Sequence, residues 1–295
     1  AVVLAGDMPL VRESSLEKLI TLAEAGDYSA LLLTGEVENP TGYGRIKRNG
    51  SQVVGIVEEK DATEEERAIK EVNLSFYCFR VADLLAALDE VKPSNTQGEY
   101  YITDCIEIMY MKGQRTGAIL IDDMEECYGV NDRSHLAMAG RALRSRINER
   151  LMTDCGVTMI DPSATYIDAD VEVGPDTVIY PGVILEGKTK IGAGCTLYQG
   201  SRIADSTIGD GTVVQNSVVQ QSTIGCGTQV GPYAFIRPGT QIGDGCRVGD
   251  FVEMKNSTIG DGTKVSHLTY VGDSDLGRDI NIGCGVVFVN YDGKE

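Results

Sequence analysis

The chain has little histidine, no tryptophan and no long apolar run. Its 295 residues include no tryptophan and only two histidines, His135 and His267, which excludes a three-histidine zinc site like that of the β-helical carbonic anhydrases. No apolar run approaches the ~20 residues that a membrane-spanning helix needs, so we expect no membrane insertion. The eight cysteines form no Cys-x-x-Cys pair, and no signal-peptide pattern opens the chain. These features favour reduced thiols and a cytoplasmic location.

Positive charge is also scarce. The 26 Lys and Arg residues face 44 Asp and Glu residues, for a formal net charge of −18. Such a charge repels phosphate backbones and anionic lipid, so we expect no nucleic-acid partner and no binding to membrane surfaces. An anionic small molecule would need locally clustered basic residues.

Glycine, in contrast, is abundant at 35 residues, and a chain of this length suggests two domains. Residues 1–132 alternate apolar strands with helical segments, the pattern of an α/β layer fold. One of these helices, in SSLEKLITLAEAG, is predicted to have a serine cap and a glycine stop. Residues 133–154 predict one long linker helix, and residues 155–295 form a second domain.

The second domain has a repeat of six residues. Apolar side chains recur at this period from Ile167 to Ile203 and again from Ile224 to Met254, and glycine follows many of them. A period of six matches neither a helix nor a flat strand. It is typical of a left-handed parallel β-helix of hexapeptide repeats, with glycine at the corners. Three hexads make one triangular coil, so residues three hexads apart should stack at the spacing of adjacent strands.

This stacking rule places Arg237 and Lys255 on neighbouring coils. The two cations should repel each other unless water or an anion lies between them, and a phosphate would suit them. Two solvated surface cations are the alternative. His267 lies two hexads beyond Lys255, which predicts a place on another face, and it is either a structural or solvated group or a general base. The same few coils contain further polar residues: Tyr270, Asn281, Asn290 and Tyr291.

Polar residues in the first domain follow presumed strands. Asp7 lies at the carboxyl end of one, where open α/β sheets bind ligands and a carboxylate can hold Mg²⁺ beside phosphates; an ordinary turn is the alternative. NPTGYGRI offers a glycine-rich approach at Gly42 and Gly44 but is not a P-loop, since no Gly-Lys-Ser/Thr follows. Three more polar residues near strand ends are either ligand contacts or solvated loop positions: Glu58, Asn73 and Asn131.

Taken in order, these segments resemble one known family. They are AGDMPL, NPTGYGRI, IVEEKDAT, EVN, QGEYYITD and GVNDR, then the hexads, then GPYAFIRPG, FVEMK, SHLTYVGD and NYDGK. They resemble the bacterial bifunctional N-acetylglucosamine-1-phosphate uridyltransferase/glucosamine-1-phosphate acetyltransferases. The resemblance implies that the solenoid transfers acetyl from acetyl-CoA to glucosamine-1-phosphate. The α/β domain would then transfer UMP from UTP to N-acetylglucosamine-1-phosphate and release pyrophosphate, giving UDP-N-acetylglucosamine for peptidoglycan and lipopolysaccharide synthesis.

The resemblance also implies roles for individual residues. His267 would be the general base of acetyl transfer, and Asp7 with Asn131 would hold Mg²⁺. The remaining roles fall into three groups: sugar-nucleotide contacts at Gly44, Glu58, Asn73 and Asn131; sugar-phosphate contacts at Arg237, Lys255, Tyr270 and Asn281; and acetyl-CoA contacts at Cys284, Asn290 and Tyr291.

The chain departs from the family pattern at several places. Leu74 and Ser75 stand where the family usually has Ser or Thr and then Gly, and Cys284 stands where Ala is usual. The glycine-rich loop that cradles UTP and the later solenoid coils are not found. We therefore expect a chain truncated at both ends and inactive in both reactions. Packing of flat solenoid faces, as in similar acetyltransferases, implies a homotrimer.

Two other classes remain as alternatives. One is a sugar-phosphate nucleotidyltransferase whose solenoid only oligomerises, as in ADP-glucose or GDP-mannose pyrophosphorylases. Such a protein would have no use for His267 beside Arg237 and Lys255. The other is a purely structural solenoid, which would not need Asp7 and Asn131.

Overall fold

The chain divides into two compact units, Ala1–Ala142 and Leu143–Glu295. This computed structural model describes residues 1–291 and 293, so three residues of the predicted second domain, Asp292, Lys294 and Glu295, lie outside the described residues. The division falls within helix α5 (Arg133–Thr153), which is the long helix expected over 133–154. The predicted domain boundaries themselves stay a prediction.

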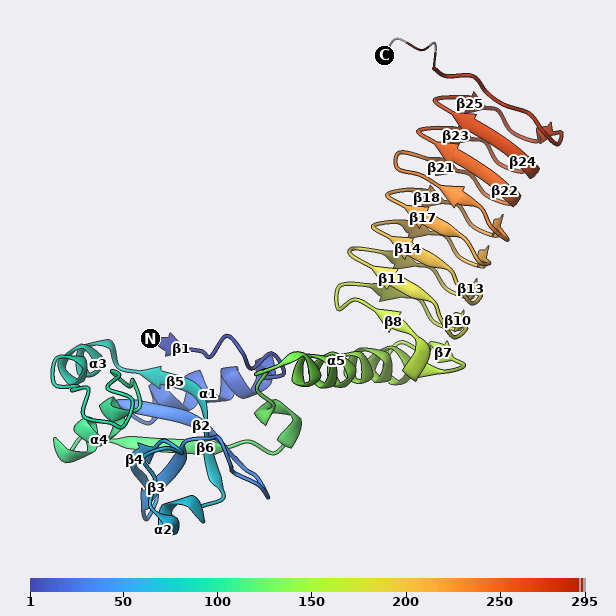
Figure 1. Ribbon diagram of the computed structural model, residues 1–295. Helices are drawn as coiled ribbons and strands as arrows, with labels where there is room; N and C mark the ends of the chain where they lie inside the picture. Colours follow the sequence, from blue (N-terminus) through green and yellow to red (C-terminus); the bar gives the residue numbers. More distant parts are fainter. Residues whose placement is uncertain (292, 294–295) are drawn as a thin grey trace. The chain divides into compact units, whose positions relative to one another are not determined.

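The first unit contains a mixed six-stranded sheet in the order β4-β3-β5-β2-β6, with β1 beside β5 (Figure 1). β2 and β6 are parallel, whereas β5 is antiparallel to β1, β2 and β3. The strands are β1 (Val2–Val3), β2 (Ala30–Glu36), β3 (Arg45–Asn49), β4 (Gln52–Val57), β5 (Glu71–Phe79) and β6 (Thr116–Leu120).

Helices cover both faces of this sheet, as an α/β layer fold requires. They are α1 (Glu13–Ala25), α2 (Glu64–Arg67), α3 (Val81–Leu88), α4 (Asp104–Met111) and the 3-10 turn η1 (Met124–Cys127). Strand β2 alternates its side chains between two apolar clusters: Ala30 and Leu32 pack in the cluster with α3 and α4, while Leu31 and Leu33 pack in the cluster with α1. This alternation buries the strand on both sides.

The start of α1 corrects one expectation. The N-cap residue is Arg12, whose side chain makes no capping hydrogen bond, so the predicted serine cap is wrong. The helix start is instead satisfied from a distant segment, because the Glu126 carboxylate accepts the Arg12 backbone N–H at 2.7 Å and the Ser15 hydroxyl at 3.0 Å. A carboxylate at this end also complements the helix dipole.

The second unit is a parallel β-solenoid whose short strands stack coil upon coil (Figure 1). Its elements are β7 (Thr158–Met159), η2 (Pro162–Ala164), β8 (Tyr166–Ile167), β9 (Glu172–Val173), β10 (Val178–Ile179), β11 (Ile184–Glu186), β12 (Lys190–Ile191), β13 (Thr196–Leu197), β14 (Arg202–Ala204), β15 (Thr207–Ile208), β16 (Val213–Val214), β17 (Val218–Gln220), β18 (Thr223–Ile224), β19 (Gln229–Val230), β20 (Phe235–Ile236), β21 (Gln241–Ile242), β22 (Arg247–Lys255), β23 (Thr258–Ile259), β24 (Lys264–Gly272), β25 (Asp275–Leu276) and β26 (Asn281–Ile282).

The coils differ in length. Ile224 pairs with Ile242, which is the predicted spacing of three full hexads. Val214, in contrast, pairs with Leu197 on one side and with Val230 on the other, and both of these coils are shorter than three hexads. The shorter coils have fewer residues at their corners. There the chain turns through one residue in the left-handed conformation, such as Asn216 with a φ of 43°. The gap between the two predicted series is therefore filled without a break, by Ile208, Val214 and Val219, which are 0–2% exposed.

The two glycines of each Ile-Gly-x-Gly corner have different physical roles. A Cβ on Gly209 would lie 2.6 Å from the backbone N of Cys226 in the next coil, so a larger residue would push the coils apart. Gly211 has a φ of 66°, a left-handed conformation that side chains disfavour. The glycine content therefore follows from coil spacing and corner geometry.

Candidate functional sites

The first unit has a polar cavity of about 420 Å³ beside its sheet. Five residues predicted to bind the sugar nucleotide or the metal line this one cavity: Asp7, Gly44, Glu58, Asn73 and Asn131. Gly42 and Ser75, which the sequence analysis also singled out, line it too, whereas the sequence prediction missed further residues of the lining: Met8, Thr41, Tyr43, Tyr128, Gly129, His135 and Met138. The folded chain therefore brings separate predicted segments to one place.

Asp7 and Asn131 are held close through their backbones. The Val130 N–H donates to the Asp7 carbonyl at 2.7 Å, and both side chains are exposed at the cavity. Among the described residues, no group of three or more His, Cys, Asp or Glu is placed to hold a metal ion. A carboxylate and an amide oxygen nevertheless suit Mg²⁺, which commonly takes one or two protein ligands and completes its shell with water and substrate phosphates.

Gly44 and Glu58 form a tight wall of the cavity. A Cβ on Gly44 would lie 3.2 Å from both carboxylate oxygens of Glu58 and 3.0 Å from Ile56. Burial raises the pKa of Glu58, while a 3.5 Å hydrogen bond from the Thr103 hydroxyl opposes the shift. A glycine here leaves the carboxylate accessible from the cavity.

Asn73 is more enclosed than a simple ligand contact would be. Its side chain accepts the Ser75 N–H at 3.1 Å and donates to the Tyr77 hydroxyl at 2.7 Å. Burial raises the pKa of Tyr77 to about 12, so the hydroxyl remains protonated. Ser75 has a φ of 59°, a left-handed conformation at the position where the resembling family usually has glycine. Leu74 points into the α1 cluster and is 1% exposed.

In the solenoid, Arg237 and Lys255 occupy neighbouring coils, as predicted. Strands β20 and β22 pair Ile236 with Met254, and the Arg237 N–H donates to the Met254 carbonyl at 2.8 Å. The Arg237 guanidinium also donates to Glu253 at 2.7 Å, so a carboxylate that the sequence prediction missed already neutralises part of its charge.

Tyr270 and Asn290 meet one coil beyond Lys255. Lys255 pairs with Gly272 in the next strand, and the Asn290 amide donates to the Tyr270 hydroxyl at 3.1 Å. A Cβ on Gly272 would lie 2.4 Å from the Asn290 amide nitrogen and 2.5 Å from the Tyr270 hydroxyl oxygen. A larger residue at position 272 would therefore have to displace the ends of these two side chains beside Lys255.

His267 lies at a corner of the solenoid. Strand β24 runs without interruption from Lys264 to Gly272 and pairs on both sides of that corner with β22. His267 therefore lies at the corner where two faces meet, and not on a face separate from that of Lys255 as predicted. The His267 Nδ1 lies 2.8 Å from Asp250 Oδ1 in the preceding coil. This contact lowers the pKa of Asp250. Sequence reasoning missed Asp250, although it precedes His267 in the sequence by the length of one coil.

The other predicted acetyl-transfer residues are less concentrated. Asn281 pairs with Lys264, on the opposite side of the corner from Tyr270. Cys284 is exposed, and so is Tyr291 at 66%. A single chain therefore gathers Arg237, Lys255, Tyr270 and Asn290 along one edge and leaves Asn281 apart from them.

The chain joins an α/β unit with a polar cavity to a solenoid of hexapeptide type. Residues 1–129 match the family described as Nucleotidyl transferase, and residues 221–256 match the family described as Bacterial transferase hexapeptide (six repeats). No helix among the described residues is long and apolar enough to cross a membrane.

Curated relatives extend this similarity to nearly the whole chain. Among them are three proteins named Bifunctional protein GlmU. That of Acetivibrio thermocellus is 54% identical over 295 residues (100% of this chain). Those of Clostridium beijerinckii and Clostridium acetobutylicum are 53% identical over 292 residues and 51% identical over 294 residues (99% of this chain for each). The chain spans 64% of the length of each. The chain is a homologue of the bifunctional GlmU proteins over the part that it shares with them.

Proposed function

We propose that this chain belongs to an enzyme that performs both steps of UDP-N-acetylglucosamine synthesis. The solenoid would acetylate glucosamine-1-phosphate with acetyl-CoA, and the α/β unit would transfer UMP from UTP to N-acetylglucosamine-1-phosphate. The observation that carries this proposal is the meeting of Asp7, Gly44, Glu58, Asn73 and Asn131 around one cavity, in a homologue of proteins named as bifunctional. A cytoplasmic location is proposed with it, because all eight cysteines are free thiols.

In uridylyl transfer, the cavity residues would bind and orient the substrates. Asp7 and Asn131 would hold Mg²⁺, which when bound neutralises phosphate charge as pyrophosphate leaves. Gly44 would let the sugar nucleotide approach the backbone closely, and Glu58 would accept hydrogen bonds from sugar hydroxyls. Asn73 would act mainly by fixing the wall at Ser75, since its amide is already bonded to Tyr77.

In acetyl transfer, His267 would take a proton from the substrate amine as nitrogen attacks the thioester carbonyl. A carbon–nitrogen bond forms, the carbon–sulfur bond breaks, and CoA leaves. The Asp250 carboxylate accepts a hydrogen bond from protonated Nδ1, which leaves Nε2 with its lone pair as the base. Arg237 and Lys255 would bind the sugar phosphate with Tyr270 and Asn281, while Cys284, Asn290 and Tyr291 would contact acetyl-CoA.

Assembly as a homotrimer is part of the proposal. Three bulky side chains are exposed at one corner of successive coils, Tyr233, Phe251 and Leu268, at 59%, 60% and 59%. All three have left-handed backbones, and the Tyr233 and Phe251 rings stack at 5.6 Å. Exposed apolar groups in strained conformations suggest a contact surface. A neighbouring copy could also supply Asn281, which one chain keeps apart from Tyr270.

Assays of both reactions test the proposed function. Incubation of a protein that contains this chain and spans the full length of its relatives with glucosamine-1-phosphate, acetyl-CoA, UTP and Mg²⁺ is expected to yield CoA, pyrophosphate and UDP-N-acetylglucosamine. Uridylyl transfer without acetyl transfer would instead favour the alternative, a sugar-phosphate nucleotidyltransferase with a purely oligomerising solenoid. Loss of both in a folded sample of that longer protein would refute the proposal, whereas the chain by itself is expected to be inactive in both reactions.

A further inference from the structure

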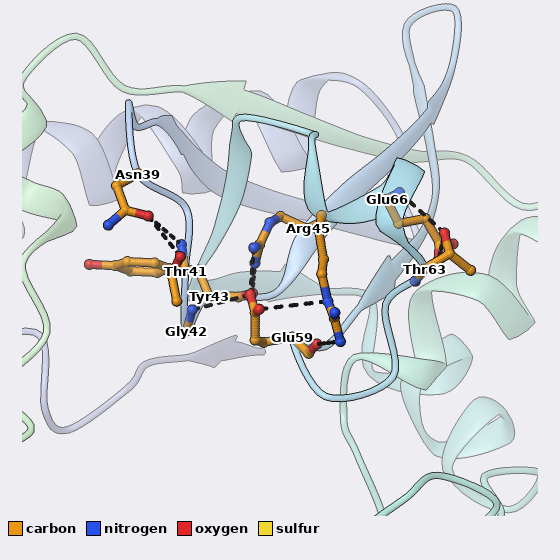
Figure 2. A network of polar contacts seen from close by, with 9 residues as sticks. Asn39, Thr41, Gly42, Tyr43, Arg45, Glu59, Thr63 and Glu66 are labelled. Carbon is orange, nitrogen blue, oxygen red and sulfur yellow. Dashed lines mark hydrogen bonds and ion pairs between the residues drawn. The ribbon is translucent and has the colours of Figure 1, made fainter.

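Arg45 is a buried charge whose position next to the cavity calls for an explanation. It begins β3 directly after Gly44, and its side chain is only 1% exposed. An arginine removed from water is costly unless it is paired and hydrogen-bonded. Its guanidinium donates from Nη1 to the Tyr43 carbonyl and from Nη2 to Glu59 Oε2, the latter at 2.5 Å (Figure 2). Its Nε has no partner among the described residues.

Glu59 connects this buried charge to the backbone of the cavity loop. The oxygen that binds Arg45 also accepts the Gly42 N–H at 3.2 Å (Figure 2). The Arg45 hydrogen bond, followed by the Gly42 N–H, lowers the pKa of Glu59, so the carboxylate stays charged. Arg67 adds a second cation at 3.8 Å from the other oxygen. A charged acceptor makes each of these bonds stronger than a neutral one would be.

The loop held in this way, residues 39–44, forms part of the cavity wall. Gly42 has a φ of 91°, and a Cβ there would meet no atom within 4 Å, so no side-chain packing holds it. The Tyr43 hydroxyl donates to the Cys127 carbonyl at 3.0 Å and anchors the opposite side of the loop. Arg45 and Glu59 therefore supply the polar contacts on the side where packing is absent.

The neighbouring glutamates have opposite roles. Glu58 lines the cavity against Gly44, whereas Glu59 does not line it and bonds to Arg45 and to the loop. Glu58 directly follows β4, and Glu59 lies in the turn that the Asp61 N–H closes by donating to the Glu58 carbonyl at 3.0 Å, so one dipeptide provides both contacts.

We propose that Arg45 and Glu59 act together as positioning residues, which hold the backbone of the 39–44 loop in place at the wall of the sugar-nucleotide cavity. The role as a determinant of substrate affinity rests on the proposed function; the role in holding the loop does not. Neither residue touches the substrate in this proposal, so their loss should change binding more than the chemical step.

The decisive variant is Glu59→Gln, which removes the charge with little change in size. Hydrogen–deuterium exchange at the amides of residues 42–44 is expected to accelerate by about tenfold, because the Gly42 N–H loses its charged acceptor, while exchange in β2 stays unchanged. The KM for N-acetylglucosamine-1-phosphate and the dissociation constant of UDP-N-acetylglucosamine should rise by a similar factor, with kcat changing less than twofold. Glu90→Gln, which breaks the surface ion pair with Lys112, is the matched control and should change neither.

Glu59→Asp serves as the conservative variant and guards against a folding defect. It keeps the charge, so loop exchange should lie between the parent and Glu59→Gln. Unchanged exchange at residues 42–44 in Glu59→Gln would refute the proposal that Arg45 and Glu59 hold the 39–44 loop. A uniform acceleration of exchange throughout the unit would refute it as well. A parent protein that binds no UDP-N-acetylglucosamine would refute the proposed function instead. The exchange measurements would still decide whether Arg45 and Glu59 hold the 39–44 loop.

Discussion

Asp250 Oδ1 and His267 Nδ1 lie 2.8 Å apart on adjacent coils of the solenoid. Their strands are paired in register, Asp250 opposite His267, so the contact is set by the stacking of the coils rather than by a flexible loop. One ring nitrogen is thereby committed to the carboxylate. The other is directed away from it, which is the arrangement that a general base requires.

In a protein that contains this chain and spans the full length of its relatives, replacement of His267 by alanine should lower acetyl-transfer turnover by about 10²–10⁴-fold, because a positioned general base contributes a factor of this size. Uridylyl transfer, which uses the other unit, should be retained. Measurement of CoA release and pyrophosphate release on the same preparation separates the two. Normal acetylation by a folded variant would return His267 to a solvated surface group.

Asp250→Asn should lower acetyl transfer by about 10-fold and leave substrate KM values nearly unchanged, because the amide can no longer hold the ring with the same preference for Nδ1–H. The pH profile of kcat is the informative kinetic readout.

The same contact should also affect stability. The lowered pKa of Asp250 means that its contact with His267 stabilises the fold above the unfolded-state pKa, and this stabilisation is lost as the pH falls through the folded-state pKa. Equal unfolding midpoints for both proteins at every pH would contradict this coupling.

Glu58→Gln should stabilise the α/β unit at neutral pH while weakening sugar-nucleotide binding. Burial raises the pKa of Glu58, so the folded state binds the proton more tightly than the unfolded state. Stability should then fall as the pH rises from the unfolded-state pKa through the folded one, and the glutamine variant should escape that loss. Thermal unfolding from acid to neutral pH should show the two proteins converging in acid. A parent that gains stability relative to Glu58→Gln as the pH rises would contradict the prediction.

In the same full-length protein, Asp7→Asn should abolish most Mg²⁺-dependent uridylyl transfer and leave acetyl transfer intact, because a neutral amide binds a hard cation far less well than a carboxylate. Titration of Mg²⁺ in the presence of UTP, followed by calorimetry, would measure the loss directly. Glu13→Gln, at the exposed start of α1, provides a control for the change in charge. Normal Mg²⁺ dependence in the Asp7 variant would remove Asp7 from the site.

Phe251→Asn should weaken self-association without disturbing the coil. Asparagine tolerates the left-handed conformation that Phe251 adopts at a φ of 55°, so the backbone strain should not increase. Light scattering should then show a trimer for the parent and smaller species for the variant at the same concentration. A parent that is monomeric at all concentrations would refute the trimer.

The solenoid could be predicted from residues such as Ile179, Leu197 and Val230, because a period of six has only one common structural solution. Its coil lengths could not, because a corner at Asn216 or Gln221 is shortened through a left-handed backbone that any of several residue types can adopt. Because coil lengths could not be predicted, the pairing of Asp250 with His267, which lie 17 residues apart, could not be predicted either.

In the α/β unit, the local sequence predicted the strands and helices and, through short motifs, the polar residues at the strand ends. The motifs do not encode the distances between these residues, which arise when β1, β4 and β5 join one sheet. The cap of α1 by Glu126 and the clamp of Gly42 by Glu59 join separate segments of the chain. Sequence alone determined the two architectures and the candidate chemistry. Only the tertiary structure decided which carboxylates reach which donors, since such contacts depend on packing between elements rather than on local preference.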